Sequence, residues 1–183
     1  ARLLGNQLPK RLVLTDWDWY LAEMANAKGY TIYLLGNPPG VAERAAQRLQ
    51  ERYPDIQVVG AAHGFFDKTS GNPENEAVIQ GVNAAQPDIL LVGFGVPLQE
   101  KWLQENWLRL NATVALPSGA LFEYLSGDLK RGPRWMTDHY MEWLARILIS
   151  PRRYWKRYLV DNVCFLWWVL KQRLFGNPFD VPG

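Results

Sequence analysis

The chain is poor in several features that mark particular classes of protein. Its one cysteine, Cys164, excludes an internal disulfide and indicates a reducing compartment. No apolar run reaches the ~20 residues that a membrane-spanning helix needs, and the opening Ala1–Gly5 is interrupted too soon to predict a signal peptide. Internal repeats and low-complexity segments are missing as well. The length of 183 residues therefore predicts a globular domain with a real core.

Acidic and basic side chains are unevenly distributed along the chain. Residues 1–129 have ten Lys and Arg against fourteen Asp and Glu, whereas residues 130–183 have ten against four. The small net charge of +2 thus hides an acidic body and a basic tail. A basic tail predicts a polyanionic partner, for which nucleic acid, a membrane surface and a diphosphate are the candidates.

Strands and helices are expected to alternate in residues 1–129. Short apolar runs bounded by Gly, Pro and Asn predict strands, and longer periodic segments predict helices. The expected strands are 30–35, 56–60, 89–92 and 113–116, and the expected helices are 17–28, 41–53, 74–85 and 98–110. This alternation predicts an α/β, Rossmann-like fold, a parallel sheet with helices on both faces.

The most specific local pattern is a glycine-rich turn between the strand 89–92 and the following helix. Gly93 and Gly95 let a ligand approach the backbone without an intervening Cβ, and Pro97 suits the first turn of a helix. The free N–H groups of that helix would point back at the turn, as they do in phosphate sites. The candidates for contact in the first helical turn are Gln99, Glu100 and Lys101.

Two further glycine-bearing turns are expected beside this one. In a parallel sheet the carboxyl ends of the strands share one edge, where ligands bind. The turns at 36–40, 93–97 and 118–120 all follow strands, so the topology places them on that edge. The nucleotide-sugar-binding candidates there are Gly36, Gly93, Gly95, Pro97, Gln99, Glu100, Lys101, Ser118, Gly119 and Glu123.

The polar candidates also have structural alternatives, which the sequence leaves open. Gln99 would hydrogen-bond a sugar or phosphate, or cap its helix. Glu100 would bind ribose hydroxyls, or balance Lys101 near the positive end of the helix. Lys101 would stabilise charge on a departing phosphate, or lie in solvent. Glu123 would bind nucleotide or sugar hydroxyls, or be an exposed carboxylate on a short helix.

Two residues join Gln99 as candidates for catalysis. Asp16 and Asp18 imitate an Asp-x-Asp signature that holds a metal–nucleotide pair, but alternate residues diverge where a helix begins. Capping by Asp16 is the better interpretation, so no metal site is predicted, while Asp16 stays a candidate to line the cleft. His63 follows a strand on the binding edge and would act as a base or sugar contact, or else order its loop.

Residues 130–183 form a second predicted part, a basic and aromatic helical appendage. Two helices are expected, 134–149 and 152–175, and Trp and Tyr alternate there with Lys and Arg. This pattern suits a membrane interface, with a solvated charged face as the alternative. Nucleic acid is disfavoured because the body is acidic and has no recognisable nucleic-acid-binding signature. The residues expected to meet lipid headgroups or a diphosphate are Arg134, Arg146, Arg152, Arg153, Lys156 and Arg157.

Several motifs follow one another in a specific order and spacing. They include Arg2-Leu3-Leu4-Gly5, His63-Gly64-Phe65-Phe66, Gly93-Phe94-Gly95-Val96-Pro97-Leu98-Gln99-Glu100-Lys101-Trp102, Gly119-Ala120-Leu121-Phe122-Glu123, Lys130-Arg131-Gly132-Pro133-Arg134-Trp135-Met136 and Glu142-Trp143-Leu144-Ala145-Arg146. In these motifs the chain resembles the WecG/TagA/CpsF family of bacterial glycosyltransferases, from Ala1 to about Tyr158.

The resemblance implies an inverting transfer of N-acetylmannosamine, or a related sugar, from a UDP donor. The implied acceptor is an N-acetylglucosaminyl-diphospho-polyprenol lipid of cell-surface polysaccharide or teichoic acid synthesis. It implies no metal or other cofactor, and a peripheral location on the anionic inner face of the bacterial plasma membrane. The oligomeric state is left open: away from lipid, the aromatic tail could pack against a second copy and give a homo-oligomer.

The chain departs from the family pattern in a few places. Family members carry an upstream Asp-Gly pair whose aspartate is the proposed base, and this chain begins after the place expected for it. Glu123 stands where Asp is usual, Ser118 where Gly is commoner, and Ser150 where Glu is usual. Two alternatives follow: a membrane-associated transferase, or a truncated, non-catalytic nucleotide-sugar-binding relative.

Overall fold

The computed structural model describes residues 18–129, 136, 142–149, 151–156 and 160–175. By its internal contacts the chain divides into two compact units. One comprises Val13–Leu129, and the other comprises Ala1–Leu12 together with Lys130–Gly183. We describe each unit by itself.

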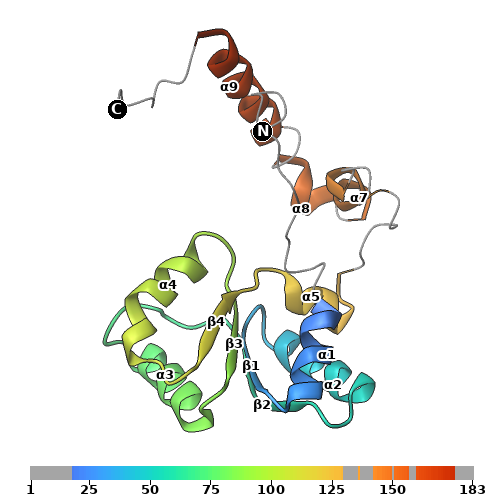
Figure 1. Ribbon diagram of the computed structural model, residues 1–183. Coiled ribbons are helices and arrows are strands. Elements are labelled where there is room, and N and C mark those ends of the chain that lie inside the picture. The colour runs from blue at the N-terminus through green and yellow to red at the C-terminus, as the bar shows by residue number, and fades with distance from the viewer. Residues whose placement is uncertain (1–17, 130–135, 137–141, 150, 157–159, 176–183) are drawn as a thin grey trace. The chain divides into compact units, whose positions relative to one another are not determined.

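The first unit is built on a four-stranded sheet (Figure 1). All neighbouring strands pair in parallel, in the order β2-β1-β3-β4. The strands are β1 (Thr31–Gly36), β2 (Gln57–Ala62), β3 (Ile89–Gly93) and β4 (Val114–Pro117). The prediction of an α/β fold with a parallel sheet is confirmed.

Helices cover both faces of this sheet, as the alternation of elements predicts (Figure 1). The helices on one face are α1 (Asp18–Lys28), α2 (Val41–Arg52) and α5 (Leu121–Ser126). Those on the other face are α3 (Pro73–Ala85), α4 (Leu98–Asn106) and the short 3₁₀ helix η3 (Trp107–Arg109).

The two faces of β1 belong to two separate cores. Ile32 and Leu34 pack with α1, α2 and α5, whereas Tyr33 and Leu35 pack with α3 and α4. Successive side chains of a strand point to opposite faces, and helices bury both faces, so β1 and β3 are apolar without alternation. Burial also raises the pKa of the Tyr33 hydroxyl.

The element boundaries differ slightly from those expected. Strand β2 continues to Ala62 instead of ending at Gly60, because its pairing with β1 resumes after a register shift between Ile32 and Tyr33 and extends to Leu35. Helix α3 begins at Pro73, and the side chain of Asn72 caps it by accepting the backbone N–H of Glu74 at 2.9 Å. The predicted helix 98–110 ends instead in the 3₁₀ turn η3.

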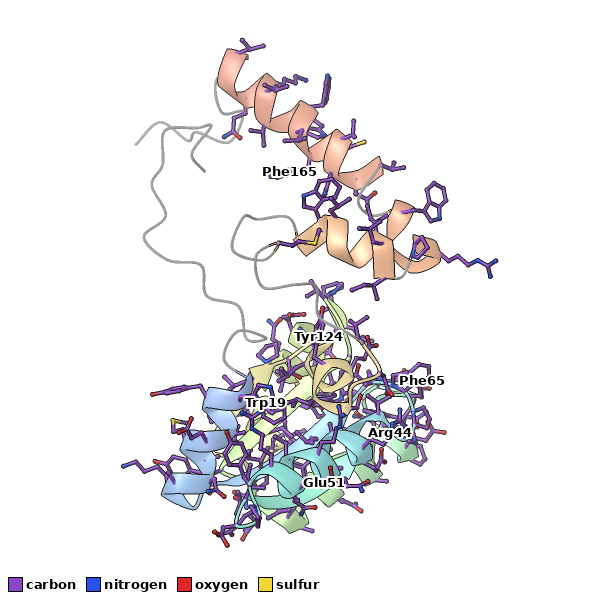
Figure 2. The ribbon with its side chains drawn as sticks, turned by 90° about the vertical axis from the view of Figure 1, so that its right-hand side faces the viewer. Trp19, Arg44, Glu51, Phe65, Tyr124 and Phe165 are labelled. Carbon is purple, nitrogen blue, oxygen red and sulfur yellow. The ribbon has the colours of Figure 1, made fainter. Side chains whose placement is uncertain are left out.

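The second unit contains the described helices α7 (Glu142–Ile149), α8 (Pro151–Lys156) and α9 (Asn162–Phe175). Pro151 opens α8, a position where its missing N–H has no intrahelical role. The side chains of α9 project around the whole helix (Figure 2). Its exposed apolar residues are Val163, Phe165, Leu166, Trp167, Trp168, Leu170 and Leu174. In the described part of the chain, no helix has both the length and the apolar character that crossing a membrane requires.

Candidate functional site

The carboxyl ends of β1 and β3 approach each other unusually closely. Gly36 pairs with Gly93, and a Cβ built on Gly36 would lie 2.5 Å from the carbonyl oxygen of Gly93. The chain leaves β1 toward one face of the sheet and β3 toward the other, through α2 and α4. Such a switch point is where open α/β sheets bind ligands. The two glycines therefore fix the geometry of the expected site.

Asn37 follows Gly36 directly and is buried next to Gly93. Its backbone is left-handed, with a φ of 61°, a conformation that Asn tolerates better than most residues. The Asn37 N–H donates to the Gly93 carbonyl at 2.8 Å, and its side-chain Nδ2 donates to the Gly119 carbonyl at 3.2 Å. Through its backbone N–H and its side chain, this one buried residue thus joins the turns after β1, β3 and β4.

Gln99, at the start of α4, ties the turns after β3 and β4 together. Its Oε1 accepts the backbone N–H groups of Gly95, at 3.2 Å, and of Gly119, at 3.1 Å. Its Nε2 donates to Glu100 at 2.9 Å, and the residue is only 4% exposed. The structure thus gives Gln99 a bridging role within the protein. Its contact with a ligand stays a prediction.

The backbone of the two bridged glycines is open on its outer side. Gly95 and Gly119 have positive φ values of 84° and 54°, and a Cβ built on either meets no atom of the described residues within 4 Å. At Gly36 and Gly93, by contrast, an added Cβ would collide with protein atoms. Gly95 and Gly119 are therefore the positions where a ligand can approach the main chain of this edge.

Ser118 and Glu123 lie next to the same turn. Ser118 donates its N–H to the Val92 carbonyl at 2.7 Å, while its hydroxyl is buried and has no hydrogen-bond partner in the described part of the chain. Glu123, in α5, is 8% exposed, which excludes the alternative of an exposed carboxylate. Both residues are thus near the binding edge, and their contacts with a nucleotide stay predictions.

Pro97, Glu100 and Lys101 lie at the outer end of the β3 turn. Pro97 precedes the first residue of α4 and follows a cis peptide bond with Val96. Glu100 and Lys101 are exposed in the first turn of α4. Glu100 accepts a hydrogen bond from Gln99. Lys101 is exposed to solvent, which agrees with its structural alternative. Its contact with a phosphate stays a prediction.

His63 lies at the end of β2, at the same edge of the sheet. Its Nδ1 accepts the backbone N–H of Phe65 at 3.2 Å, which is the loop-ordering alternative. Phe65 itself is 68% exposed at the surface (Figure 2). The neighbouring Gly64 donates its N–H to the Asn37 carbonyl at 2.8 Å and so joins this loop to the turn after β1.

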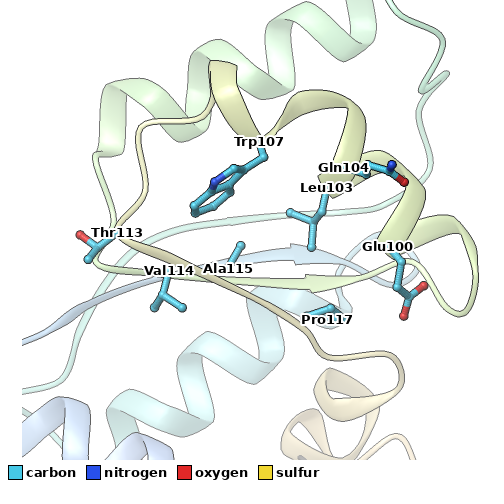
Figure 3. Close-up of a pocket in the computed structure, with 8 residues that line it drawn as sticks. All are labelled: Glu100, Leu103, Gln104, Trp107, Thr113, Val114, Ala115 and Pro117. Atoms are coloured by element: carbon cyan, nitrogen blue, oxygen red, sulfur yellow. The ribbon is translucent and has the colours of Figure 1, made fainter.

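A hollow of about 600 Å³ lies between α4, η3 and the outer strand β4 (Figure 3). Its walls are mainly apolar, and Trp107 and Leu103 point from the helical side toward the strand (Figure 3). Among the predicted site residues, Glu100 lines it. The full lining is Glu100, Leu103, Gln104, Trp107, Thr113, Val114, Ala115 and Pro117.

The remaining predicted residues are less fully described. Asp16, Arg134 and Arg157 lie outside the described residues. Arg152 is exposed on α8, and the backbones of Arg146, Arg153 and Lys156 belong to α7 and α8. Among the described residues, no group of three or more His, Cys, Asp or Glu side chains is arranged to hold a metal ion.

Sequence reasoning missed Asn37 and Lys68 as residues of this edge. The signal for Asn37 was present, since an Asn directly after a strand-ending Gly favours a left-handed turn. Lys68 gave no local signal, because its partners Gly64, Phe66 and Phe94 come from two different loops.

The fold is that of a doubly wound α/β protein in which three glycine-bearing turns meet at one edge of the sheet. Residues 1–178 match the family described as "Glycosyl transferase WecG/TagA/CpsF family". The chain belongs to this family of glycosyltransferases, so the resemblance seen in the sequence is confirmed.

Two curated relatives carry the name N-acetylglucosaminyldiphosphoundecaprenol N-acetyl-beta-D-mannosaminyltransferase. The protein from Bacillus subtilis (strain 168) is 30% identical over 159 residues, which cover 87% of this chain and 59% of the relative. The protein from Staphylococcus aureus (strain NCTC 8325 / PS 47) is 33% identical over 135 residues, covering 74% of this chain and 49% of the relative. The chain spans about half the length of the curated relatives that it matches.

Proposed function

We propose that this chain binds a UDP-sugar at the edge of its sheet and takes part in transferring N-acetylmannosamine, or a related sugar, to an N-acetylglucosaminyl-diphospho-polyprenol lipid. The names of the relatives support the transferred sugar and the acceptor. In the proposed step an acceptor hydroxyl attacks the anomeric carbon from the face opposite UDP. The bond to the β-phosphate oxygen breaks with inversion, UDP leaves, and the hydroxyl proton passes to a base.

The open backbone at Gly95 and Gly119 is the observation that carries this proposal. Departure of UDP develops negative charge on the β-phosphate, and donors held rigidly in place stabilise such charge best. Gln99 fixes the two glycines through hydrogen bonds of 3.2 and 3.1 Å, so the edge is rigid before a ligand binds. The N–H groups after Gly95, together with Lys101, are the proposed diphosphate donors.

The basic tail is proposed to bind the membrane face that carries the lipid acceptor. The exposed Trp167 and Trp168 of α9 lie beside Lys171, whose ammonium nitrogen is 5.3 and 5.1 Å from their ring centroids. Aromatic rings next to cations suit the headgroup region of an anionic bilayer. The arginines of the appendage would hold the diphosphate of the lipid, and location at the inner face of the plasma membrane follows from this proposal.

Thermal protection by UDP tests the binding site. Gln99→Ala removes the bridge between the two turns, and Lys101→Ala removes the proposed phosphate cation. Both should reduce the rise in melting temperature that UDP produces. Gln50→Ala and Lys28→Ala, at exposed positions on α2 and α1, are the matched controls. Unchanged protection in both site variants would contradict the proposed pocket.

Transfer from radiolabelled UDP-N-acetylmannosamine to the lipid acceptor separates the two functional alternatives. Inverting transfer by this chain supports the enzyme. UDP protection without transfer supports the non-catalytic binder. We also propose that transfer needs no divalent metal, and a rate that disappears with EDTA and returns with Mg²⁺ would refute that part.

A further inference from the structure

The loop after β2 holds a lysine in an unusual place. The ammonium group of Lys68 donates to the carbonyl oxygens of Gly64 and of Phe66, the latter at 3.2 Å. It also lies 4.1 Å from the ring centroid of Phe66 and 4.4 Å from that of Phe94. Lysine side chains usually extend into solvent, so four simultaneous contacts show that this one is held by the fold.

These contacts connect Lys68 with the binding edge. Phe94 lies between Gly93 and Gly95, the two glycines of the β3 turn, and its ring packs edge-on against Phe66 and Trp102 at 5.6 and 5.4 Å. Gly64 is equally confined, because an added Cβ there would lie 2.8 Å from the Phe94 ring and 3.1 Å from the Cα of Gly36. The Lys68 ammonium group thus contacts Gly64, which packs against the turn after β1, and Phe94, which belongs to the turn after β3.

The charge of Lys68 is partly withdrawn from water. Burial lowers the pKa of its ammonium group, and the neighbouring Asp67 carboxylate opposes this effect. The two carbonyl oxygens and the two aromatic faces are the interactions that offset the lost hydration. A neutral side chain of the same length would fill the space but would make neither the hydrogen bonds nor the electrostatic contact with the rings.

We propose that Lys68 is a positioning residue of the UDP site: its ammonium group fastens the loop after β2 to Phe94 and thereby sets the position of the open backbone at Gly95. Lys68 acts through Phe94 and Gly64, since two of its three N–H donors are directed to carbonyl oxygens of its own loop. The inference deepens the proposed function and rests on it, because it names nucleoside diphosphate affinity as the property that Lys68 controls.

The test compares two substitutions at one position. Lys68→Met keeps the apolar stem and removes the charge, whereas Lys68→Arg keeps a cation that can donate to the same carbonyls. We expect Lys68→Met to weaken UDP binding, measured by calorimetry, about tenfold, and Lys68→Arg to stay within about threefold of the original protein. Lys28→Met, the same change at an exposed position on α1, should leave the affinity unchanged.

Several results would overturn the inference. Lys68→Met could lower the melting temperature and leave UDP affinity intact, which would make Lys68 merely structural. An Arg variant as weak as the Met variant would show that the charge is not what matters. Should Lys68→Met fail to fold, Phe94→Leu removes the ring and keeps apolar volume. UDP affinity unchanged in that variant would also refute the coupling.

Hydrogen exchange distinguishes failure of this inference from failure of the proposed function. The N–H of Gly64 donates to Asn37 and the N–H of Gly95 donates to Gln99. Both should exchange about tenfold faster in Lys68→Met than in Lys28→Met, whether or not UDP binds. If the unmodified protein binds no UDP, the proposed function fails, and unchanged exchange in Lys68→Met would then refute the coupling as well.

Discussion

The α/β unit and the C-terminal helices use the same aromatic residue in opposite ways. Trp102 of α4 is 1% exposed, and its indole N–H donates to Asn75 Oδ1 at 2.7 Å. Trp167 and Trp168 of α9 are each 57% exposed. The first ring is part of a protein core, whereas the other two present a large apolar surface on a helix of the second unit.

The difference lies in how apolar residues are arranged along each element. In β1 and α2 they occur at spacings that turn them toward the sheet or the helices that cover it. In α9 they occur on every side of the helix (Figure 2), so one packing surface could not bury them all. A helix that is apolar all round is typical of burial in a protein core or in lipid, and lipid is the environment that we propose for α9.

Truncating a tryptophan in each region should give the largest contrast. Trp102→Ala removes a fully buried ring and leaves Asn75 without its donor, so we expect a loss of about 3–5 kcal/mol in the free energy of unfolding. Trp168→Ala, the same change at an exposed site, should alter it by less than about 0.5 kcal/mol. Urea denaturation measures both. Equal losses would mean that α9 is packed as tightly as the α/β core.

A methyl group at the close approach of β1 and β3 should be nearly as damaging. Gly36→Ala places a Cβ 2.5 Å from the Gly93 backbone at a φ of 145°, so we expect a loss of about 1–3 kcal/mol and of UDP protection. Gly71→Ala is the matched control, because its φ is also positive, at 79°, but no atom of the residues that the structure describes would lie within 4 Å of the added Cβ. If both variants lose the same free energy of unfolding, backbone strain at positive φ, and not crowding, explains the loss at Gly36.

Removing both exposed rings of α9 should change membrane binding without changing the fold. The double variant Trp167→Ser and Trp168→Ser should pellet with anionic vesicles about tenfold less strongly, because two interfacial anchors are lost. Its melting temperature should stay the same, since the α/β core is intact. Undiminished pelleting would assign the membrane contact to another segment or remove it altogether.

The smallest expected effect concerns an ion pair on the surface of the α/β unit. Arg44 of α2 bonds Asp128, which follows α5, and that hydrogen bond lowers the pKa of the Asp128 carboxyl. A carboxyl group whose pKa is lowered by folding stabilises the folded protein at pH values above its ordinary pKa of 3.8. This contribution is lost as the pH falls through the lower pKa of the folded state. Asp128→Asn should therefore cost less than about 1 kcal/mol at pH 7.

Asp128→Asn should lower the free energy of unfolding still less in strong acid, because the Asp128 carboxyl is then protonated in the original protein as well. Melting curves recorded from pH 7 to pH 2 measure the difference in stability between the variant and the original protein, and Asp55→Asn at an exposed position is the control. A difference that grows as pH falls would contradict the assigned pairing.

Sequence patterns alone predicted the α/β class, the parallel sheet and the meeting of three turns on one edge. Short apolar runs such as Ile89–Val92, bounded by turn residues, carry their structural preference locally. Parallel topology then brings their carboxyl ends together. The basic and aromatic character of the tail is equally a property of composition.

Only the tertiary structure decided which atoms of the edge are free. Gln99 reaches Gly119 across twenty positions of the chain, and Asn37 reaches the same glycine from another strand. Lys68 likewise depends on Phe94, which comes from a different loop. Hydrogen bonds and ring contacts between distant segments depend on packing, and a single sequence without its fold does not specify their partners.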